Sequence, residues 1–241
     1  MKLLIAVVCN SINLGAADFN KAVAAIQRQV SEHLSPIWNC DAQIQPFTHI
    51  NQVPNGYSII TLESLPENCF ERVLAVEPII CKLLVTKTWT FNLSRIILQT
   101  VTNPFFKQFE CNNEIVYSVD VCAPCGASEY EIDCVVVSDF VKPDYYKNKQ
   151  TTTTTYQGVN LFFAKRGSYV YGFDIEKNKW FLSSFFASNA VREDLNTNAS
   201  DNLQQTIKIV NDALEAHKIE KENAFAEERT FINYQKKYLI A

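Results

Sequence analysis

The sequence predicts an α+β protein with a β-hairpin region and a long C-terminal helix. Short apolar runs of strand length alternate with segments whose apolar residues recur every three or four positions, as on one face of a helix. Hydrophobic residues make up 47% of the 241 residues and charged residues 20%, which is typical of a chain that buries a core. We therefore expect a globular fold.

The chain is expected to begin with a strand followed by a helix. Residues 2–8, apolar at every position after Lys2, are typical of a strand that is covered on both faces. Asp18 can cap the helix and Pro36 ends it. Its core-facing stripe, with steps of three and four residues, consists of Phe19, Val23, Ile26, Val30 and Leu34.

Three more strands are expected before the next helix. Residues 42–47 and 57–62 read as extended segments on either side of the turn-forming residues 54–56. Residues 79–85 are another apolar run of strand length.

The middle of the chain changes to helical spacing and back again. Residues 92–102 predict a short, largely buried helix, which Pro104 closes. Residues 114–121 and 133–140 are rich in Val, Ile and Tyr and suit strands.

A loop and a hairpin are expected next. Residues 142–158 read as loop, and the five threonines at 151–155 inside it are typical of a solvated linker. Residues 169–173 and 179–182 flank a polar turn at 176–178, which indicates a β-hairpin.

The C-terminal residues 199–241 predict a long amphipathic helix. Its apolar edge follows a 4-3-4-3 spacing and consists of Leu203, Ile207, Val210, Leu214 and His217. This edge can pack on the chain's own body, on a second copy or on another protein. The expected division is a core at 1–147, the loop and hairpin region at 148–198 packing on it, and this helix.

Charge and hydropathy exclude two classes of partner. Lys and Arg total 22 against 26 Asp and Glu, so the chain lacks the basic surplus that nucleic-acid binding needs. No apolar run approaches the roughly 18 to 20 residues that cross a bilayer. The apolar stretch at the N-terminus is too short for a signal peptide, and the 8 cysteines are scattered, so a cytoplasmic protein with reduced thiols is expected.

Residues 89–104, WTFNLSRIILQTVTNP, resemble the central helix of a family of bacterial zinc-metallopeptidase-like proteins, which reads WTxxxSHELLExxxDP. Residues 25–30 and 35–42 are similar to its AIQxQV and APxWGxxA stretches, and residues 121–124 and 130–143 to its EVCDPVE and YxxxGxxVSDFVxP stretches. The likeness covers roughly residues 3 to 182. It implies a zincin-like mixed sheet with packed helices.

The positions that would carry the family's chemistry are substituted. The motif His and Glu are Arg95 and Ile96, and the Glu one turn on is Gln99. Arg is always protonated and cannot bind zinc, Ile cannot act as a base, and neutral amides bind zinc poorly. The Asp before the proline is Asn103, and of the acids in EVCDPVE only the first survives, as Asp120. We therefore expect no catalytic residue, no metal and no other cofactor.

No other set of residues predicts a metal or redox site clearly. His33, His49 and His217 show no paired spacing; His33 lies near a helix end, and the other two are expected on the surface. Cys122 and Cys125, with Cys111 and Cys134 nearby, allow a four-thiolate zinc site, but packing explains them as well.

Arg95 has two possible roles if the helix keeps its place. A buried guanidinium needs a carboxylate, and Asp120 is the best internal candidate, in which case the pair plugs the old cleft. In an open cleft Arg95 could instead bind the carboxylate of a peptide or small acid. The expected vestigial cleft consists of Trp89, Arg95, Gln99, Asn103 and Asp120.

The sequence thus favours a catalytically inactive, metallopeptidase-like pseudoenzyme that binds a protein or peptide, through the altered cleft or the C-terminal helix. One alternative is an enzyme with rebuilt chemistry, for which the thiols of Cys122 and Cys125 and the acids Glu129 and Glu131 are available. Another is a structural homo-oligomer built on the C-terminal helix.

Overall fold

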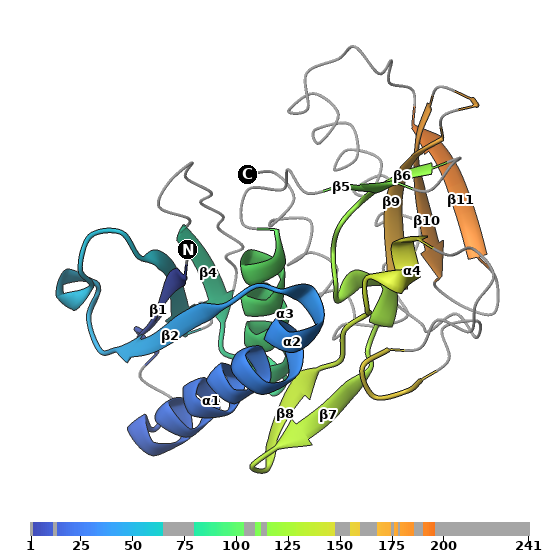
Figure 1. Ribbon diagram of the computed structural model, residues 1–241. Helices are drawn as coiled ribbons and strands as arrows, with labels where there is room; N and C mark the ends of the chain where they lie inside the picture. Colours follow the sequence, from blue (N-terminus) through green and yellow to red (C-terminus); the bar gives the residue numbers. More distant parts are fainter. Residues whose placement is uncertain are drawn as a thin grey trace. The chain divides into compact units, whose positions relative to one another are not determined.

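The protein is described by a computed structural model, drawn in Figure 1. The structure describes residues 2–11, 14–64, 80–103, 109–111, 115–147, 155–159, 168–174, 176–177, 179–185 and 190–195. The chain divides into two compact units. Unit 1 comprises Met1–Pro104 and Glu129–Asp139, and unit 2 comprises Phe105–Ser128 and Phe140–Ala241.

Unit 1 contains a four-stranded parallel sheet in the order β2-β1-β3-β4. Its strands are β1 (Leu3–Cys9), β2 (Ala42–Phe47), β3 (Ser58–Glu63) and β4 (Ile80–Leu84). Ile5 to Val8 of β1 are completely buried because β1 has a neighbour on each edge and side chains on both faces are covered. The predicted apolar first strand is confirmed.

The helical part of unit 1 is longer and less regular than expected. It runs through α1 (Ala16–Arg28), a π-helical segment (Gln29–Leu34) and α2 (Ser35–Trp38). Gly15 is the N-cap of α1, so the expected capping by Asp18 is wrong; Asp18 lies in the first turn instead. Pro36 also does not end the helix, because it occupies the first turn of α2, where a proline needs no hydrogen bond.

Two polar contacts of Gln27 in α1 fix the neighbouring backbone of β2. The Gln27 side chain donates from Nε2 to Ala42 O (3.2 Å) and accepts at Oε1 from Ile44 N (2.7 Å), which occupies backbone groups along the outer edge of β2. Pro46 continues the same edge and has no N–H. Both features blunt a strand edge that could otherwise pair with another chain.

The second long helix, α3 (Trp89–Thr102), follows β4, and a hairpin of β7 (Glu129–Ile132) and β8 (Val135–Ser138) packs on it (Figure 1). Residues 91–102 are buried on every side of α3, which confirms the predicted buried helix at 92–102. A short 3₁₀ turn (Ile50–Gln52) lies between β2 and β3.

Unit 2 contains a five-stranded antiparallel sheet in the order β11-β10-β9-β6-β5. Its strands are β5 (Phe109–Cys111), β6 (Ile115–Ser118), β9 (Ser168–Asp174), β10 (Lys179–Phe185) and β11 (Ala190–Leu195). A 3₁₀ turn (Ala123–Cys125) and the short helix α4 (Asp144–Lys147) belong to the same unit. The predicted hairpin at 169–182 is confirmed as β9 and β10.

The α+β class is confirmed, but the arrangement differs from the single mixed sheet that was expected. Within the described ranges, the parallel strands form one sheet and the antiparallel strands form two others. The division into units also crosses the expected core at 1–147, because residues 105–128 cluster with the later strands and not with the N-terminal sheet.

Two predictions fall wholly or partly outside the described residues. The C-terminal helix at 199–241 lies outside them, as do residues 151–154 of the threonine run. Thr155, the last residue of that run, is described, completely buried and bridged to Val141, so it is not part of a solvated linker. No helix in the described part of the chain is long and apolar enough to span a membrane.

Candidate functional site

The substituted motif positions lie on one buried face of α3. Arg95, Gln99 and Asn103 follow each other at intervals of four residues, so they line the same side of the helix and its C-cap. Their exposed fractions are 1%, 3% and 1%. Trp89, at the first position of the helix, is half-buried. Apart from Trp89, the α3 residues of the expected cleft offer almost no surface to a ligand.

Arg95 is one of the largest fully buried side chains in the described part of the protein. Its Cζ lies 5.6 Å from the centroid of the Phe91 ring, one turn earlier on α3. A guanidinium stays charged in the interior, so its burial carries a large desolvation cost that its neighbours must offset. The structure thus excludes an Arg95 that projects into bulk solvent.

Other polar side chains of α3 are buried too. Ser94 Oγ donates to Phe91 O (2.8 Å), and Thr102 Oγ1 donates to Leu98 O (2.9 Å). Asn92 Oδ1 and Thr100 Oγ1 are buried without a hydrogen-bond partner within the described residues. A buried acceptor or hydroxyl without a partner costs about 1–3 kcal/mol.

Asp120, the surviving acid of the EVCDPVE stretch, stabilises its own turn in unit 2. It is 8% exposed, and its Oδ1 accepts from the backbone N–H groups of Cys122 (3.0 Å) and Ala123 (2.9 Å). The Tyr146 hydroxyl donates to Asp120 O (2.8 Å) and accepts from Asp120 N (3.1 Å). Arg95 belongs to unit 1 and Asp120 to unit 2, so the predicted pair between them stays a prediction.

Two neighbouring tyrosines of unit 2 are held in the protonated form. Burial raises the pKa of Tyr146 well above its ordinary value, and the nearby charge of Asp120 raises it further. Burial also raises the pKa of Tyr145. Neither phenol is therefore suited to act as a base or nucleophile near neutral pH.

The cysteines do not assemble into an accessible site in the described part of the chain. Cys122 and Cys125 form no disulfide and are completely buried, and Cys125 Sγ donates to Val121 O (3.9 Å). Cys134 is exposed at the turn between β7 and β8. Among the described residues, no three His, Cys, Asp or Glu side chains are grouped so that they could hold a metal ion.

The histidines take different positions. His49 is exposed, as expected, and His217 lies outside the described residues. His33 is half-buried in the π-helical segment and not at the end of the helical region. Its pKa is lowered, mainly by burial.

Sequence reasoning missed a polar cluster in unit 1 that involves several residues of the family-like stretches. Gln29 Nε2 donates to Ser138 O (2.7 Å), and Ser138 N donates to Ser94 Oγ (2.7 Å). The AIQxQV, WTxxxS and VSDF stretches therefore meet at the backbone of Ser138. Their resemblance to family landmarks was the signal that could have singled these residues out.

Comparison with protein-family models, curated proteins and solved structures finds no match to this chain. The metallopeptidase-like family stays a prediction from the sequence.

Proposed function

We propose that this chain is a catalytically inactive metallopeptidase-like protein that acts by binding a protein or peptide. The observation that carries the proposal is Arg95: a permanently charged side chain occupies the position of the motif's metal-binding His and is 1% exposed on a buried helix. A cation site could not form around a buried guanidinium without displacing it.

The distribution of matches and substitutions supports the same proposal. Gln29, Ser94 and Ser138 match the family-like stretches, and they bond to one another in unit 1. The substituted positions, Arg95 and Gln99, are those that would bind the metal or hold its ligands. The chain thus has the contacts that such a fold needs and lacks the groups that its chemistry needs.

The zincin-like architecture is part of this proposal. A parallel sheet whose last described strand, β4, leads directly into the buried helix α3 gives the motif helix a rigid support. The hairpin of β7 and β8 packs on the same helix. These features are compatible with a metallopeptidase-like origin.

The binding surface is proposed to lie outside the old cleft. Arg95, Gln99 and Asn103 are too deeply buried to contact a partner. The apolar edge predicted for residues 203–214 is the better candidate, because an apolar helix stripe needs a cover. This cover is proposed to be a partner protein or a second copy, and packing on the chain's own body is the alternative.

A cytoplasmic location is proposed with it. Cys9, Cys40, Cys122, Cys125 and Cys134 form no disulfide in the structure, which suits a reducing compartment. The rebuilt thiol chemistry has no support from the described residues, because Cys122 and Cys125 are completely buried and a substrate could not reach them.

Metal analysis tests the catalytic part of the proposal. Elemental analysis of the purified full-length chain, after incubation with zinc and removal of the excess, is expected to find substoichiometric zinc. A general peptidase assay is expected to find no cleavage that a chelator abolishes. Stoichiometric zinc or chelator-sensitive cleavage would refute the proposal.

A matched variant makes this test sharper. Arg95→His combined with Gln99→Glu restores two metal-binding side chains one helical turn apart. If these positions formed the ancestral site, the folded variant should take up more zinc than the wild type. Circular dichroism controls for folding.

Light scattering tests the binding part through self-association. Ile207→Asp places a charge on the predicted apolar edge, and Gln205→Asp places the same charge on the opposite side of the predicted helix. If the edge joins two copies, Ile207→Asp lowers the mass of the full-length protein and Gln205→Asp does not. A wild-type chain that is already monomeric excludes the homo-oligomer and leaves the chain's own body or a different protein as the cover of this edge.

A further inference from the structure

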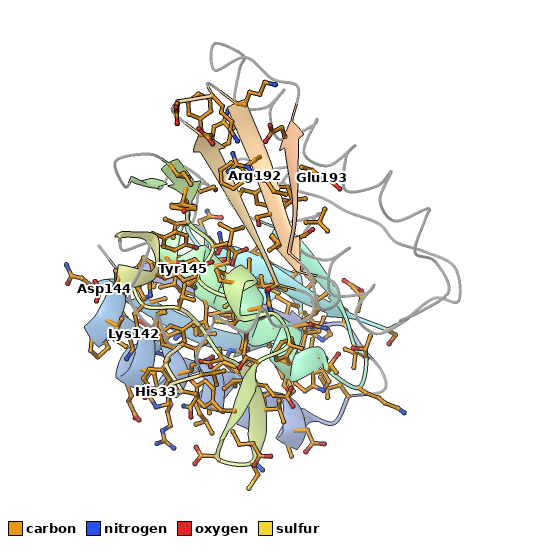
Figure 2. All side chains as sticks on the ribbon, turned by 90° about the vertical axis from the view of Figure 1, so that its right-hand side faces the viewer. His33, Lys142, Asp144, Tyr145, Arg192 and Glu193 are labelled. Atoms are coloured by element: carbon orange, nitrogen blue, oxygen red, sulfur yellow. The ribbon has the colours of Figure 1, made fainter. Side chains whose placement is uncertain are left out.

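A chain of hydrogen bonds joins the π-helical segment of unit 1 to the β7–β8 hairpin. Gln29, at the start of that segment, is completely buried, and its Nε2 lies 2.7 Å from Ser138 O and 3.1 Å from the Tyr130 hydroxyl. The same hydroxyl lies 2.9 Å from His33 Nδ1. Gln29 and His33 thus contact one tyrosine of β7 from positions four residues apart in the segment. His33 is labelled in Figure 2.

The directions of the two Gln29 bonds in this chain can be derived from the fixed end at Ser138. Ser138 contributes a carbonyl, which can only accept, so the Gln29 group that faces it is the amide N–H₂. That group can only donate, so the Tyr130 oxygen accepts from it. The Tyr130 O–H is then available to donate to His33 Nδ1. The direction of this last bond depends on the tautomer, and with the Tyr130 O–H as its donor His33 is neutral and carries its proton on Nε2.

The charged groups around His33 do not favour its protonation strongly. Burial lowers its pKa, the carboxylate of Glu32 raises it, and the guanidinium of Arg28 lowers it. Arg28 itself is bound to Glu32 (Nη2–Oε2, 3.2 Å) and to Asp133 in the hairpin turn (Nη1–Oδ2, 2.6 Å). The guanidinium of Arg28 therefore already compensates part of the negative charge near His33.

We propose that His33, Tyr130 and Gln29 form a pH-sensitive latch that holds the β7–β8 hairpin to the π-helical segment when His33 is neutral. Protonation places a hydrogen on His33 Nδ1, which then faces the Tyr130 oxygen as a donor. The Tyr130 O–H must turn away from His33, and the buried Gln29 amide shares its acceptor with a cation. The hairpin is then held less firmly, while Arg28 and Asp133 still connect its turn to α1.

The latch is also connected to α3 through Ser138. Ser138, whose carbonyl anchors the chain of bonds, donates its N–H to Ser94 Oγ on α3. Loosening the hairpin therefore also loosens the side of α3 that carries Ser94. The latch is independent of the proposed loss of catalysis and goes beyond it.

Hydrogen exchange of the full-length protein tests the latch. The amides of residues 129–139 are measured by mass spectrometry at about pH 7.5 and about pH 5.5, with rates corrected for intrinsic exchange. In the wild type the protection of these amides is expected to fall by roughly threefold to tenfold at the lower pH. In His33→Gln, which cannot gain a charge, it should change little.

Two further variants make the outcome decisive. Tyr130→Phe keeps the ring and removes the hydroxyl, so its hairpin should be weakly protected at both pH values, as the wild type is at the lower one. His49→Gln removes an exposed histidine and should behave like the wild type. The proposal is overturned if His33→Gln keeps the full pH dependence, or if the wild-type hairpin is equally protected at both pH values.

Discussion

Two arginines of this protein lie beside aromatic rings, in opposite surroundings. Arg192 of β11 is exposed (Figure 2), its Cζ lies 3.9 Å from the centroid of the Phe181 ring, and it is bound to two carboxylates. Arg95 of α3 is 1% exposed, and its Cζ lies 5.6 Å from the centroid of the Phe91 ring.

The difference shows that contacts that stabilise the fold explain the presence of one arginine but not of the other. Arg192 combines solvent, a ring face and the acids Asp174 and Asp194, an ordinary set of contacts for a surface cation. The Arg95 side chain is desolvated. With an apolar side chain of similar volume at this interior position, the folded protein would often be as stable. On the metallopeptidase-like origin that we propose, the position of Arg95 is better explained by the loss of a metal site than by stability.

The largest expected effect comes from truncating the buried arginine. Arg95→Ala leaves a cavity in the interior and removes the charge to which its neighbours are adapted, so it should lower the free energy of unfolding by about 3–5 kcal/mol. Arg192→Ala, the matched change at the surface, should cost only about 0.5–1 kcal/mol. Urea unfolding of both variants measures the difference. Equal costs would mean that Arg95 is not held in the interior.

A second prediction tests how the Phe181 ring, which contacts Arg192, packs on Gly172. Gly172 of β9 pairs with Phe181 of β10, and a Cβ on Gly172 would lie 2.6 Å from Phe181 Cζ and 2.9 Å from Ile115 Cγ2. The Phe181 ring therefore lies across the glycine, with Arg192 against it. Gly172→Ala should cost about 1–3 kcal/mol, because the ring must move away from a buried strand.

A double-mutant cycle separates this steric effect from strand propensity. Phe181→Leu removes the ring, so adding Gly172→Ala to it should cost less than adding the same change to the wild type. Equal costs in the two backgrounds would show that the ring does not require the glycine. Chemical denaturation of the four proteins gives the coupling.

The elements with strong local patterns were predictable from the sequence, and the irregular ones were not. The apolar run at residues 2–8 and the stripe through Phe19 and Leu34 predicted β1 and the first helical region, because burial on one or both faces dictates those periods. The π-helical segment has no such signal, since apolar spacing barely distinguishes it from an α-helix.

The β7–β8 turn shows a second kind of failure. A strand was expected at residues 133–140, but Asp133 and Cys134 form the turn, with φ of 52° and 59°. These left-handed conformations favour Gly or Asn, so an Asp-Cys pair gives little warning of a turn. The YxxxGxxVSDF pattern has glycine at the position of Cys134, and that glycine was the available clue.

The candidate site was predictable in position but not in environment. The motif placed Arg95, Gln99 and Asn103 on one face of a helix, and α3 has them there. The pattern of residues 92–102 predicted a largely buried helix, but whether its polar face closes or stays open as a cleft depends on packing between distant parts of the chain. The role of Asp120 as the acceptor of its own turn likewise depends on the conformation of residues 120–123.

The smallest expected effect concerns the acid that binds Arg192. The pKa of Asp174 is lowered from its ordinary value of 3.8, first by the backbone N–H of Lys177, which donates to Oδ1 (3.0 Å), and then by Arg192. A carboxyl group with a lowered folded pKa stabilises the fold above its unfolded pKa, and this contribution is lost as the pH falls through the folded pKa. Asp174→Asn should therefore reduce stability at neutral pH and flatten the decline in stability below pH 3.8.

Urea midpoints at neutral pH and over this acid range measure both changes. Glu176→Gln, which removes an exposed carboxyl from the same turn, is the control and should leave the decline in place. If the wild type and Asp174→Asn decline in parallel, the lowered pKa of Asp174 does not contribute to the stability of the sheet on which Arg192 lies.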